Sequence, residues 1–201
     1  MPPRRLFLVL GATALVAGRG LIRPAAAQSA SDAAAFIKAT GEALVKTVDS
    51  SGSTEQKAKD IARIIDQRVD VNGIARFCLG RFWRTASPSQ QQEYLDLFRQ
   101  VLVRSIDSKM GEYKGVSFTI GRTVGRETGQ VVSTVITRPN QPPADVDWVV
   151  QQVDGAPRIV DVIAAGTSLR LTQRSDYASF IVHNNESIQA LLDAMKKQVS
   201  S

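Results

Sequence analysis

The side chains that could carry out catalysis are few in this sequence. His183 is the only histidine, so a Ser-His-Asp or Cys-His arrangement would have to use it. It stands beside Asn184 and Asn185 at the expected end of a helix, which favours a surface or capping role. Ser168 lies in a Gly-Thr-Ser-Leu-Arg string that lacks the second glycine of a nucleophile elbow, so we interpret it as a turn or cap residue.

Metal and nucleotide chemistry are disfavoured as well. One histidine and one cysteine, far apart in the chain, do not form a zinc site. Asp145 and Asp147 lie on the same face of an expected strand. Exposure of this strand to solvent explains the two acidic residues as well as a pair of catalytic carboxylates would. The sequence contains no G-x-x-x-x-G-K-[ST] loop for nucleotide phosphates, so a partner would have to hydrolyse any ATP. We therefore predict that the protein is not an enzyme and holds no metal or cofactor.

The first 27 residues have the pattern of an export signal. Arg4 and Arg5 precede a short apolar run at residues 6–17, and three alanines stand directly before Gln28. The run is far shorter than the roughly 20 residues of a membrane-spanning helix. We expect residues 1–27 to be a signal peptide that directs the protein to the periplasm. The Sec route is favoured, and the arginine pair leaves a twin-arginine signal open.

Charge and cysteine content narrow the class of protein further. The chain has 25 Lys+Arg and 19 Asp+Glu, a net charge of +6, and removal of four arginines with residues 1–27 leaves +2. A nucleic-acid-binding protein needs a more concentrated basic face. Cys78 is the only cysteine, so an intrachain disulfide is excluded, and its apolar helical neighbours predict a buried side chain. Residues 28–201 are expected to form one domain.

The first half of residues 28–201 has the period of amphipathic helices. Ser31, Ser53 and Asp70 can each cap the apolar stripe that follows, and Ser53 begins an S-x-x-Q capping box. Ser87-Pro88-Ser89-Gln90 is the strongest start signal, because a serine cap is followed by proline at the first helical position. The helix that follows is expected to end near residue 110.

From residue 115 onward the apolar period changes from helical to two. Four alternating runs, which include Phe118, Val135, Trp148 and Val162, are separated by glycine and proline turns. This pattern predicts a four-stranded antiparallel meander.

The final segment is helical again. Thr172 is the expected cap of a helix after residue 166, and the two asparagines at 184–185 separate it from a last amphipathic helix. Helices, then a meander, then helices indicate an α+β fold with helices packed on one face of the sheet.

Three segments in fixed order carry a family likeness. Residues 79–84 read LGRFWR and are followed by SPSQ; the second segment is the strand block around Asp147-Trp148. The third joins residues 160–163, 166–169 and 174–177. Together they resemble the LGRYWR…SPEQ and YDVxIxGxSL…YRSxF passages of the MlaC, or toluene-tolerance, family. The likeness extends over roughly residues 31–198. Ala-Pro-Arg at residues 156–158 departs from the usual W-K, which could alter a cavity mouth or a contact surface.

The resemblance implies a soluble periplasmic carrier that holds phospholipid acyl chains in an apolar cavity between a curved sheet and helices. It also implies two partners, an inner-membrane ABC lipid transporter complex and an outer-membrane lipoprotein complex, and a monomeric carrier. A diacyl lipid exposes about 30 methylenes, and leaving them in water costs on the order of 25 kcal/mol at roughly 0.8 kcal/mol each. Such a carrier therefore needs a deep cavity.

The expected lining of that cavity consists of apolar strand and helix residues. They are Phe82, Phe98, Leu102, Phe118, Ile120, Val135, Trp148, Val150, Val160, Val162, Leu169 and Ile181. Arginine suits bidentate binding of a lipid phosphate, and the family-like segments contain three arginines that could do so. These head-group candidates are Arg81, Arg84 and Arg174.

Several alternatives remain open from the sequence. An apolar strand that faces an apolar helix is also the ordinary core of an α+β domain, and only the resemblance favours a cavity. The three arginines can equally be surface cations or pair with an acid such as Asp176. A hopanoid or another polycyclic lipid would suit the same pocket, and an adaptor with a filled core would bind no lipid.

Overall fold

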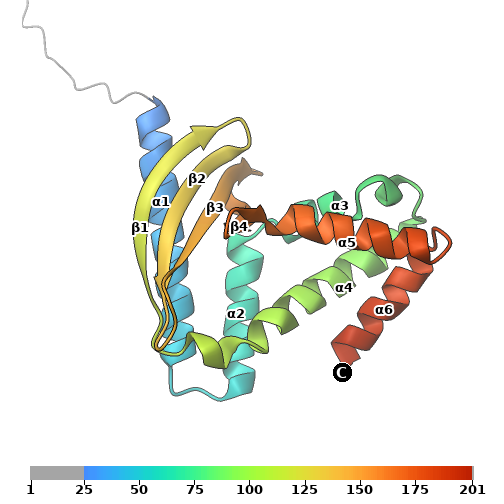
Figure 1. The fold of residues 1–201 in the computed structure, drawn as a ribbon, viewed down its shortest axis with the longest axis horizontal. Coiled ribbons are helices and arrows are strands. Elements are labelled where there is room, and N and C mark those ends of the chain that lie inside the picture. Colours follow the sequence, from blue (N-terminus) through green and yellow to red (C-terminus); the bar gives the residue numbers. More distant parts are fainter. Residues whose placement is uncertain (1–24, 201) are drawn as a thin grey trace, which may run out of the picture.

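Six α-helices, two short 3-10 helices and five strands make up residues 25–200, the part of the chain that the computed structural model describes (Figure 1). In chain order they are α1 (Ala25–Asp49), α2 (Thr54–Arg68), α3 (Val71–Leu79), η1 (Gly80–Arg84), α4 (Pro88–Asp107), η2 (Met110–Tyr113), β1 (Ser117–Arg126), β2 (Gly129–Thr137), β3 (Ala144–Val153), β4 (Ala156–Ala164), β5 (Thr167–Ser168), α5 (Leu169–His183) and α6 (Ile188–Ser200). Nearly all of the predicted signal peptide lies outside the described residues and stays a prediction.

The start signals of three helices are confirmed. Ser87 Oγ accepts from the Gln90 amide at 3.2 Å, and the Gln90 side chain accepts from the Ser87 amide at 3.1 Å, which completes the capping box of α4. Ser53 caps α2 at 3.2 Å from the Gln56 amide, and Asp70 caps α3. These short polar side chains satisfy amides that have no partner within the helix.

Two predicted caps are wrong. Ser31 lies inside α1, because the alanines on both sides of it are strong helix formers and the helix already begins at Ala25. Thr172 lies inside α5, and Ser168 is the cap instead, with its Oγ accepting from the Leu171 amide at 3.2 Å. The interpretation of Ser168 as a turn or cap residue is therefore confirmed.

The sheet is an antiparallel meander in the order β1-β2-β3-β4-β5, with five strands where four were predicted. The extra strand, β5, has only two residues, too few for a periodic pattern to reveal. It forms because the chain reverses through Ala165 and Gly166, whose φ angles are 49° and 76°, and pairs at once with the end of β4. Glycine adopts such positive φ values at little cost.

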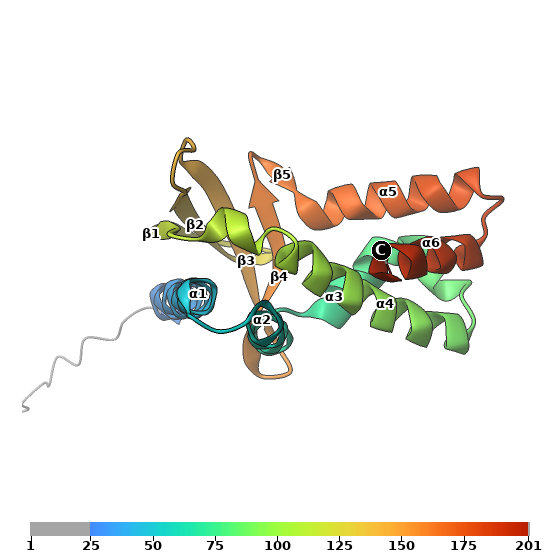
Figure 2. The same cartoon turned by 90° about the horizontal axis from the view of Figure 1, so that it is seen from below.

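Helices cover the sheet in two separate groups. The curved sheet runs along α1 in Figure 1, and Figure 2 shows α3, α4, α5 and α6 gathered to one side of it. Phe36 and Ile37 of α1 are buried against Val132, Val150 and Ile159 of the sheet. A second apolar core, here called the helical cluster, is formed by α2 to α6 and includes Tyr94, Phe98, Ile181 and Leu192. The fold thus has two cores on the helix side of the sheet, and a small third cluster of Val131, Val149 and Val160 lies on the opposite sheet face.

The approach of α1 to β1 is set by a glycine. A Cβ atom on Gly41 would lie 2.4 Å from Cζ of Phe118, so only a residue without a side chain lets the tip of this ring approach the helix so closely. This contact fixes the distance between α1 and the edge strand.

We expect Gly41→Ala to lower the free energy of unfolding by about 1–3 kcal/mol, because the added methyl group forces the Phe118 ring or α1 to move. Urea unfolding followed by circular dichroism measures the change. The matched control is Gly111→Ala, since a Cβ there meets no atom within 4 Å. Equal stability of the two variants would contradict the close contact between α1 and β1.

Candidate functional site

One face of the sheet is turned toward the helices, and its register identifies its members. Nε1 of Trp148 donates to Oγ1 of Thr134 at 2.9 Å, which places both side chains on the same face. Thr134 pairs with Ile120 on one side and with Val146 on the other, and Trp148 pairs with Val162. Since side chains alternate along each strand, this face carries apolar residues on all four long strands, with Thr134 among them.

Coverage of this face changes along the strands. At one end Val132, Val150 and Ile159 are buried beneath α1. At the other end the apolar residues are only half-buried, and we call this set the apolar sheet surface. Its members are Phe118, Ile120, Ile136, Val146, Trp148, Val162 and Ala164. The helices therefore leave this half of the face incompletely covered.

Burial of the apolar side chains also decreases along α4. Tyr94, Leu97 and Phe98 are buried in the first half of α4, whereas Leu102 and Ile106 in the second half are half-buried. α4 and α5 separate from each other as they approach the sheet (Figure 1). We give the name wedge to the half-buried Leu102 and Ile106 at this end of α4 together with the apolar sheet surface. Every member of the wedge is thus only partly shielded from solvent.

The β1 edge of the apolar sheet surface borders a groove of about 640 Å³ between α1 and β1. Val45, Val116, Phe118 and Ile120 give it apolar walls, while Lys38, Glu42, Lys46, Ser117 and Thr119 complete its lining. Lys38 and Glu42 form an exposed ion pair at 3.8 Å. The groove thus combines an apolar interior with two lysines, a combination suited to an amphiphile with an anionic head group.

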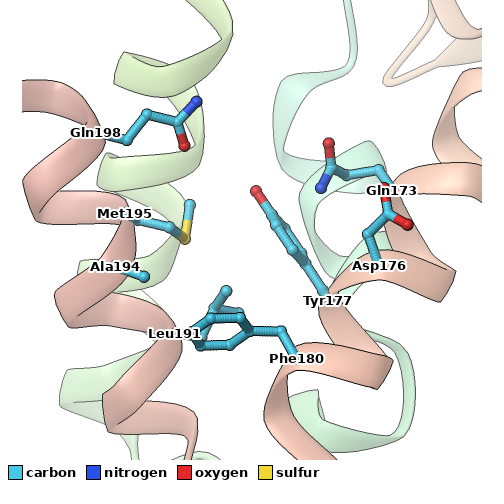
Figure 3. Close-up of a pocket in the computed structure, with 8 residues that line it drawn as sticks. All are labelled: Gln173, Asp176, Tyr177, Phe180, Leu191, Ala194, Met195 and Gln198. Atoms are coloured by element: carbon cyan, nitrogen blue, oxygen red, sulfur yellow. The ribbon is translucent and has the colours of Figure 1, made fainter. Parts of the chain in front are cut away.

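A smaller hollow of about 230 Å³ lies between α5 and α6. Figure 3 shows Tyr177 and Phe180 of α5 directed toward Leu191 and Met195 of α6, with polar side chains of both helices around them. The rings of Tyr94 and Phe98 lie 6.1 and 6.4 Å from the Tyr177 ring. The hollow therefore adjoins the helical cluster.

The structure divides the predicted cavity residues between the two cores. Phe82, Phe98 and Ile181 are buried in the helical cluster, and Leu102 packs against it. The sheet residues Ile120, Trp148, Val150 and Val162 belong to the core beneath α1, and Phe118 lines the groove. Trp148, Val162 and Leu102 are half-buried members of the wedge, and their contact with lipid stays a prediction.

Three of the predicted cavity residues do not face the helices together with the rest. Val135 points to the opposite face of the sheet and is 39% exposed, because it alternates with Thr134 and Ile136. Val160 packs with Val131 and Val149 on that opposite face, since a bulge beside Val149 adds a residue to β4. Leu169 is 51% exposed at the start of α5.

Each of the three head-group candidates makes its own contacts. Arg81 lies 3.6 Å from Glu186 in an exposed ion pair and stacks on Phe82. Arg174 stacks on Phe77 with 4.9 Å between the guanidinium carbon and the ring centroid, and Arg84 is exposed. The predicted contact of these arginines with a lipid phosphate remains a prediction.

The residues considered for catalysis occupy ordinary structural positions. His183 is exposed, with Nδ1 2.7 Å from the Ser179 carbonyl oxygen one turn earlier. Cys78 is buried, its thiol donates to the Arg170 carbonyl, and this burial raises its pKa to about 12. Among residues 25–200 no three His, Cys, Asp or Glu side chains form a metal-binding group, and no helix is long and apolar enough to cross a bilayer.

Sequence reasoning missed a buried carboxylate. Asp161, on β4, is only 5% exposed and accepts hydrogen bonds from Ser168 Oγ at 2.6 Å and from the Val162 amide at 2.8 Å. Arg170 Nε lies 3.3 Å from the same carboxylate. The available signal was an aspartate in a valine-rich strand, followed seven residues later by serine.

Comparison with known proteins agrees with this fold. A family model described as MlaC protein matches residues 34–197. Among solved structures, the fold resembles a phospholipid-binding protein from Ralstonia solanacearum determined in complex with a phospholipid. The TM-score is 0.72 at 20% sequence identity, and the match covers 84% of this chain and 97% of that one. At this identity the structural likeness shows a shared fold.

We expect the free energy of unfolding to be steady up to pH 9 and to fall as the pH rises further. Burial raises the pKa values of Cys78, Tyr94 and Tyr177, so these groups stay neutral in the folded protein but ionise in the unfolded chain near their ordinary values of 9.0 and 10.0. Unfolding then releases protons, and each group contributes a loss of about 1.4 kcal/mol per pH unit above its unfolded pKa.

Urea unfolding at pH 8, 9.5 and 10.5 tests this linkage. Tyr177→Phe should show a shallower decline than the parent protein, because one ionisable group is removed. An identical decline in both proteins would contradict the assignment of the slope to Tyr177.

Proposed function

This chain belongs to the MlaC family, and from that premise we propose that it binds phospholipid and carries it through the periplasm. In this proposal the acyl chains lie against the side chains of the wedge. The single observation that carries the proposal is the half-burial of seven apolar side chains on one sheet face, beside a groove of about 640 Å³. The phospholipid complex of the Ralstonia solanacearum protein, which shares the fold, supports this ligand class.

The energetic requirement explains why an incompletely covered surface is useful. A carrier has to remove about 30 methylenes from water, which is worth on the order of 25 kcal/mol at roughly 0.8 kcal/mol each. A fully packed core has no room for such chains without strain. Apolar side chains that are only half-buried can bind acyl chains, and few contacts within the protein are lost when they do so.

The polar head group of the lipid can stay at the rim of the site, in contact with water. Lys38 and Lys46 stand at the groove, where their ammonium groups can attract a phosphate that stays in water. We retain Arg81, Arg84 and Arg174 as proposed head-group contacts on the helical side. Exposed cations of this kind would raise the rate of encounter with an anionic lipid more than the final affinity.

The proposed cycle requires two partners and no chemistry on the lipid. The carrier would receive and deliver phospholipid at an inner-membrane ABC transporter complex and an outer-membrane lipoprotein complex, with ATP hydrolysed by the transporter. Membership of the family supports this cycle, the periplasmic location and the signal peptide at residues 1–27. The ordinary environments of His183 and Cys78 support a binding protein over an enzyme.

Trp148 offers a direct test, because the only other tryptophan, Trp83, lies in η1 within the helical part. In a Trp83→Phe variant, phosphatidylethanolamine with brominated acyl chains is expected to quench Trp148 fluorescence strongly, since bromine quenches only at short range. The Trp148→Phe variant, which keeps Trp83, is the control and should be quenched less. Equal quenching of the two variants would show that the acyl chains do not lie against the apolar sheet surface.

Two neighbouring residues on opposite sheet faces give a matched mutational test. Ile136→Asp places a carboxylate on the apolar sheet surface and should lower phospholipid retention by at least about tenfold, because charge burial is costly. Val135→Asp puts the same charge on the other, exposed face and should leave retention unchanged. Native mass spectrometry after mixing with vesicles measures the bound fraction. Detection of a hopanoid in extracts of the native protein would show that the cargo is a polycyclic lipid. Absence of any lipid uptake would refute the proposal that the protein is a lipid carrier.

A further inference from the structure

Trp148 marks the boundary between the covered and the half-buried part of the helix-facing sheet face. Val132, Trp148 and Val162 pair across three strands and form one row of this face. The next row in one direction contains Val150 and Ile159, which are buried beneath α1. The apolar residues in the rows on the other side are half-buried. Trp148 is therefore the largest side chain in the row where the half-buried part meets the core.

A hydrogen bond fixes the direction in which the indole ring points. Nε1 of Trp148 lies 2.9 Å from Oγ1 of Thr134, on the neighbouring strand β2. Thr134 pairs with Val146 and so belongs to the next row on the half-buried side. The ring therefore leans away from Val150 and toward the half-buried rows. An acyl chain that lies along these rows meets the indole before it reaches the core beneath α1.

Both bonds of the Thr134 hydroxyl hold this arrangement in place. An indole nitrogen can only donate, so the threonine oxygen accepts its proton. The threonine proton in turn goes to the Val146 carbonyl at 3.0 Å, on the strand that also carries Trp148. Thr134 is only 3% exposed, so water does not compete for either bond. The hydroxyl thus ties the indole to the backbone of its own strand.

Packing restrains the ring as well. Trp148 packs against the core beneath α1, as do its neighbours Ile120 and Val162. A ring with one side packed and its polar atom bonded has few rotamers left to it. The indole is therefore a fixed obstacle on the sheet face and cannot turn aside to make room for a longer chain.

We infer that Trp148 limits how far acyl chains extend along the sheet, and that Thr134 is the positioning residue that holds the indole in this place. The carrier thereby selects phospholipids by the length of their acyl chains. In an apolar site of fixed shape, one methylene group too many lowers the relative affinity about tenfold or more. This inference rests on the proposed phospholipid binding and adds to it the feature that discriminates among phospholipids.

A competition between phospholipids of graded chain length tests the inference. The protein is mixed with vesicles that contain equal amounts of phosphatidylethanolamines with lauroyl, myristoyl, palmitoyl, stearoyl and arachidoyl chains, and native mass spectrometry identifies the bound species. Trp148→Leu removes much of the ring, so the limit should move to longer chains by at least one member of this series. That member should gain about tenfold in bound fraction relative to the parent protein.

Two variants of Thr134 separate its hydroxyl from its shape. Thr134→Val keeps the shape but cannot accept from the indole, so the limit should move in the same direction as in Trp148→Leu. Thr134→Ser keeps the hydroxyl and should keep the limit of the parent protein. In a Trp83→Phe background the fluorescence emission of Trp148 should change in the valine variant only. A purely structural role of Thr134 would lower stability and leave the chain-length limit unchanged.

Ile136→Ala is the matched control. It removes apolar volume from the same sheet face, two rows away from Trp148 on the half-buried side. It should lower the retention of all chain lengths to a similar degree without moving the limit. The same vesicles serve for every variant, so differences in the escape of lipids from the bilayer cancel in the comparison. If Trp148→Leu does not fold, Trp148→Phe is the milder change and should move the limit by a smaller amount.

The outcomes separate the two proposals. Absence of phospholipid uptake by the parent protein would refute the proposed function and this inference together. Normal uptake with an unchanged limit in the folded Trp148 variants, or an equal shift in Ile136→Ala, would refute the inference alone. A shift in Trp148→Leu with none in Thr134→Val would support Trp148 as the limit and refute the positioning role of Thr134.

Discussion

The packing of α1 against one half of the sheet is the contact on which the rest of the structure depends. Phe36 and Ile37 are buried against Val132, Val150 and Ile159, and burial of side chains of this size contributes about 1.5–3 kcal/mol each. At Gly41 the helix meets the ring of Phe118 and then leaves Val45 on the wall of the groove. The remaining apolar side chains of this sheet face are only half-buried.

The proposed function would divide stability and ligand binding between different parts of the fold. The helical cluster, with Tyr94 donating to the Ala75 carbonyl at 2.9 Å, and the α1–sheet core are densely buried and can hold the fold together without a ligand. The wedge is only half-buried and contributes less to stability. A carrier needs this division, because the free energy gained on lipid binding has to come from apolar groups that are not already satisfied by the protein.

The family-like segments can be understood from the contacts they make. Gly80, with φ of 58°, lies so close to Arg174 that a Cβ would be 3.1 Å from its Nε, so the first and third segments meet there. Asp161 and Ser168 of the third segment bond to each other across the turn before α5. Asp161 and Ser168 thereby anchor a helix to the sheet, and their polar character follows from that role.

Local signals in the sequence determined the α+β class, the meander order, the helix starts at Ser53, Asp70 and Ser87, and the burial of Cys78. They did so because capping and periodicity act between residues a few positions apart. The two-residue strand β5 and the cap at Ser168 depend on pairing with β4, and the opposite orientations of Val135 and Val160 depend on register and a bulge. Which apolar residues are covered is decided by helices distant in the chain. For that reason the sequence could name Trp148, Val162 and Leu102 as apolar, whereas only the tertiary structure shows that they are half-buried.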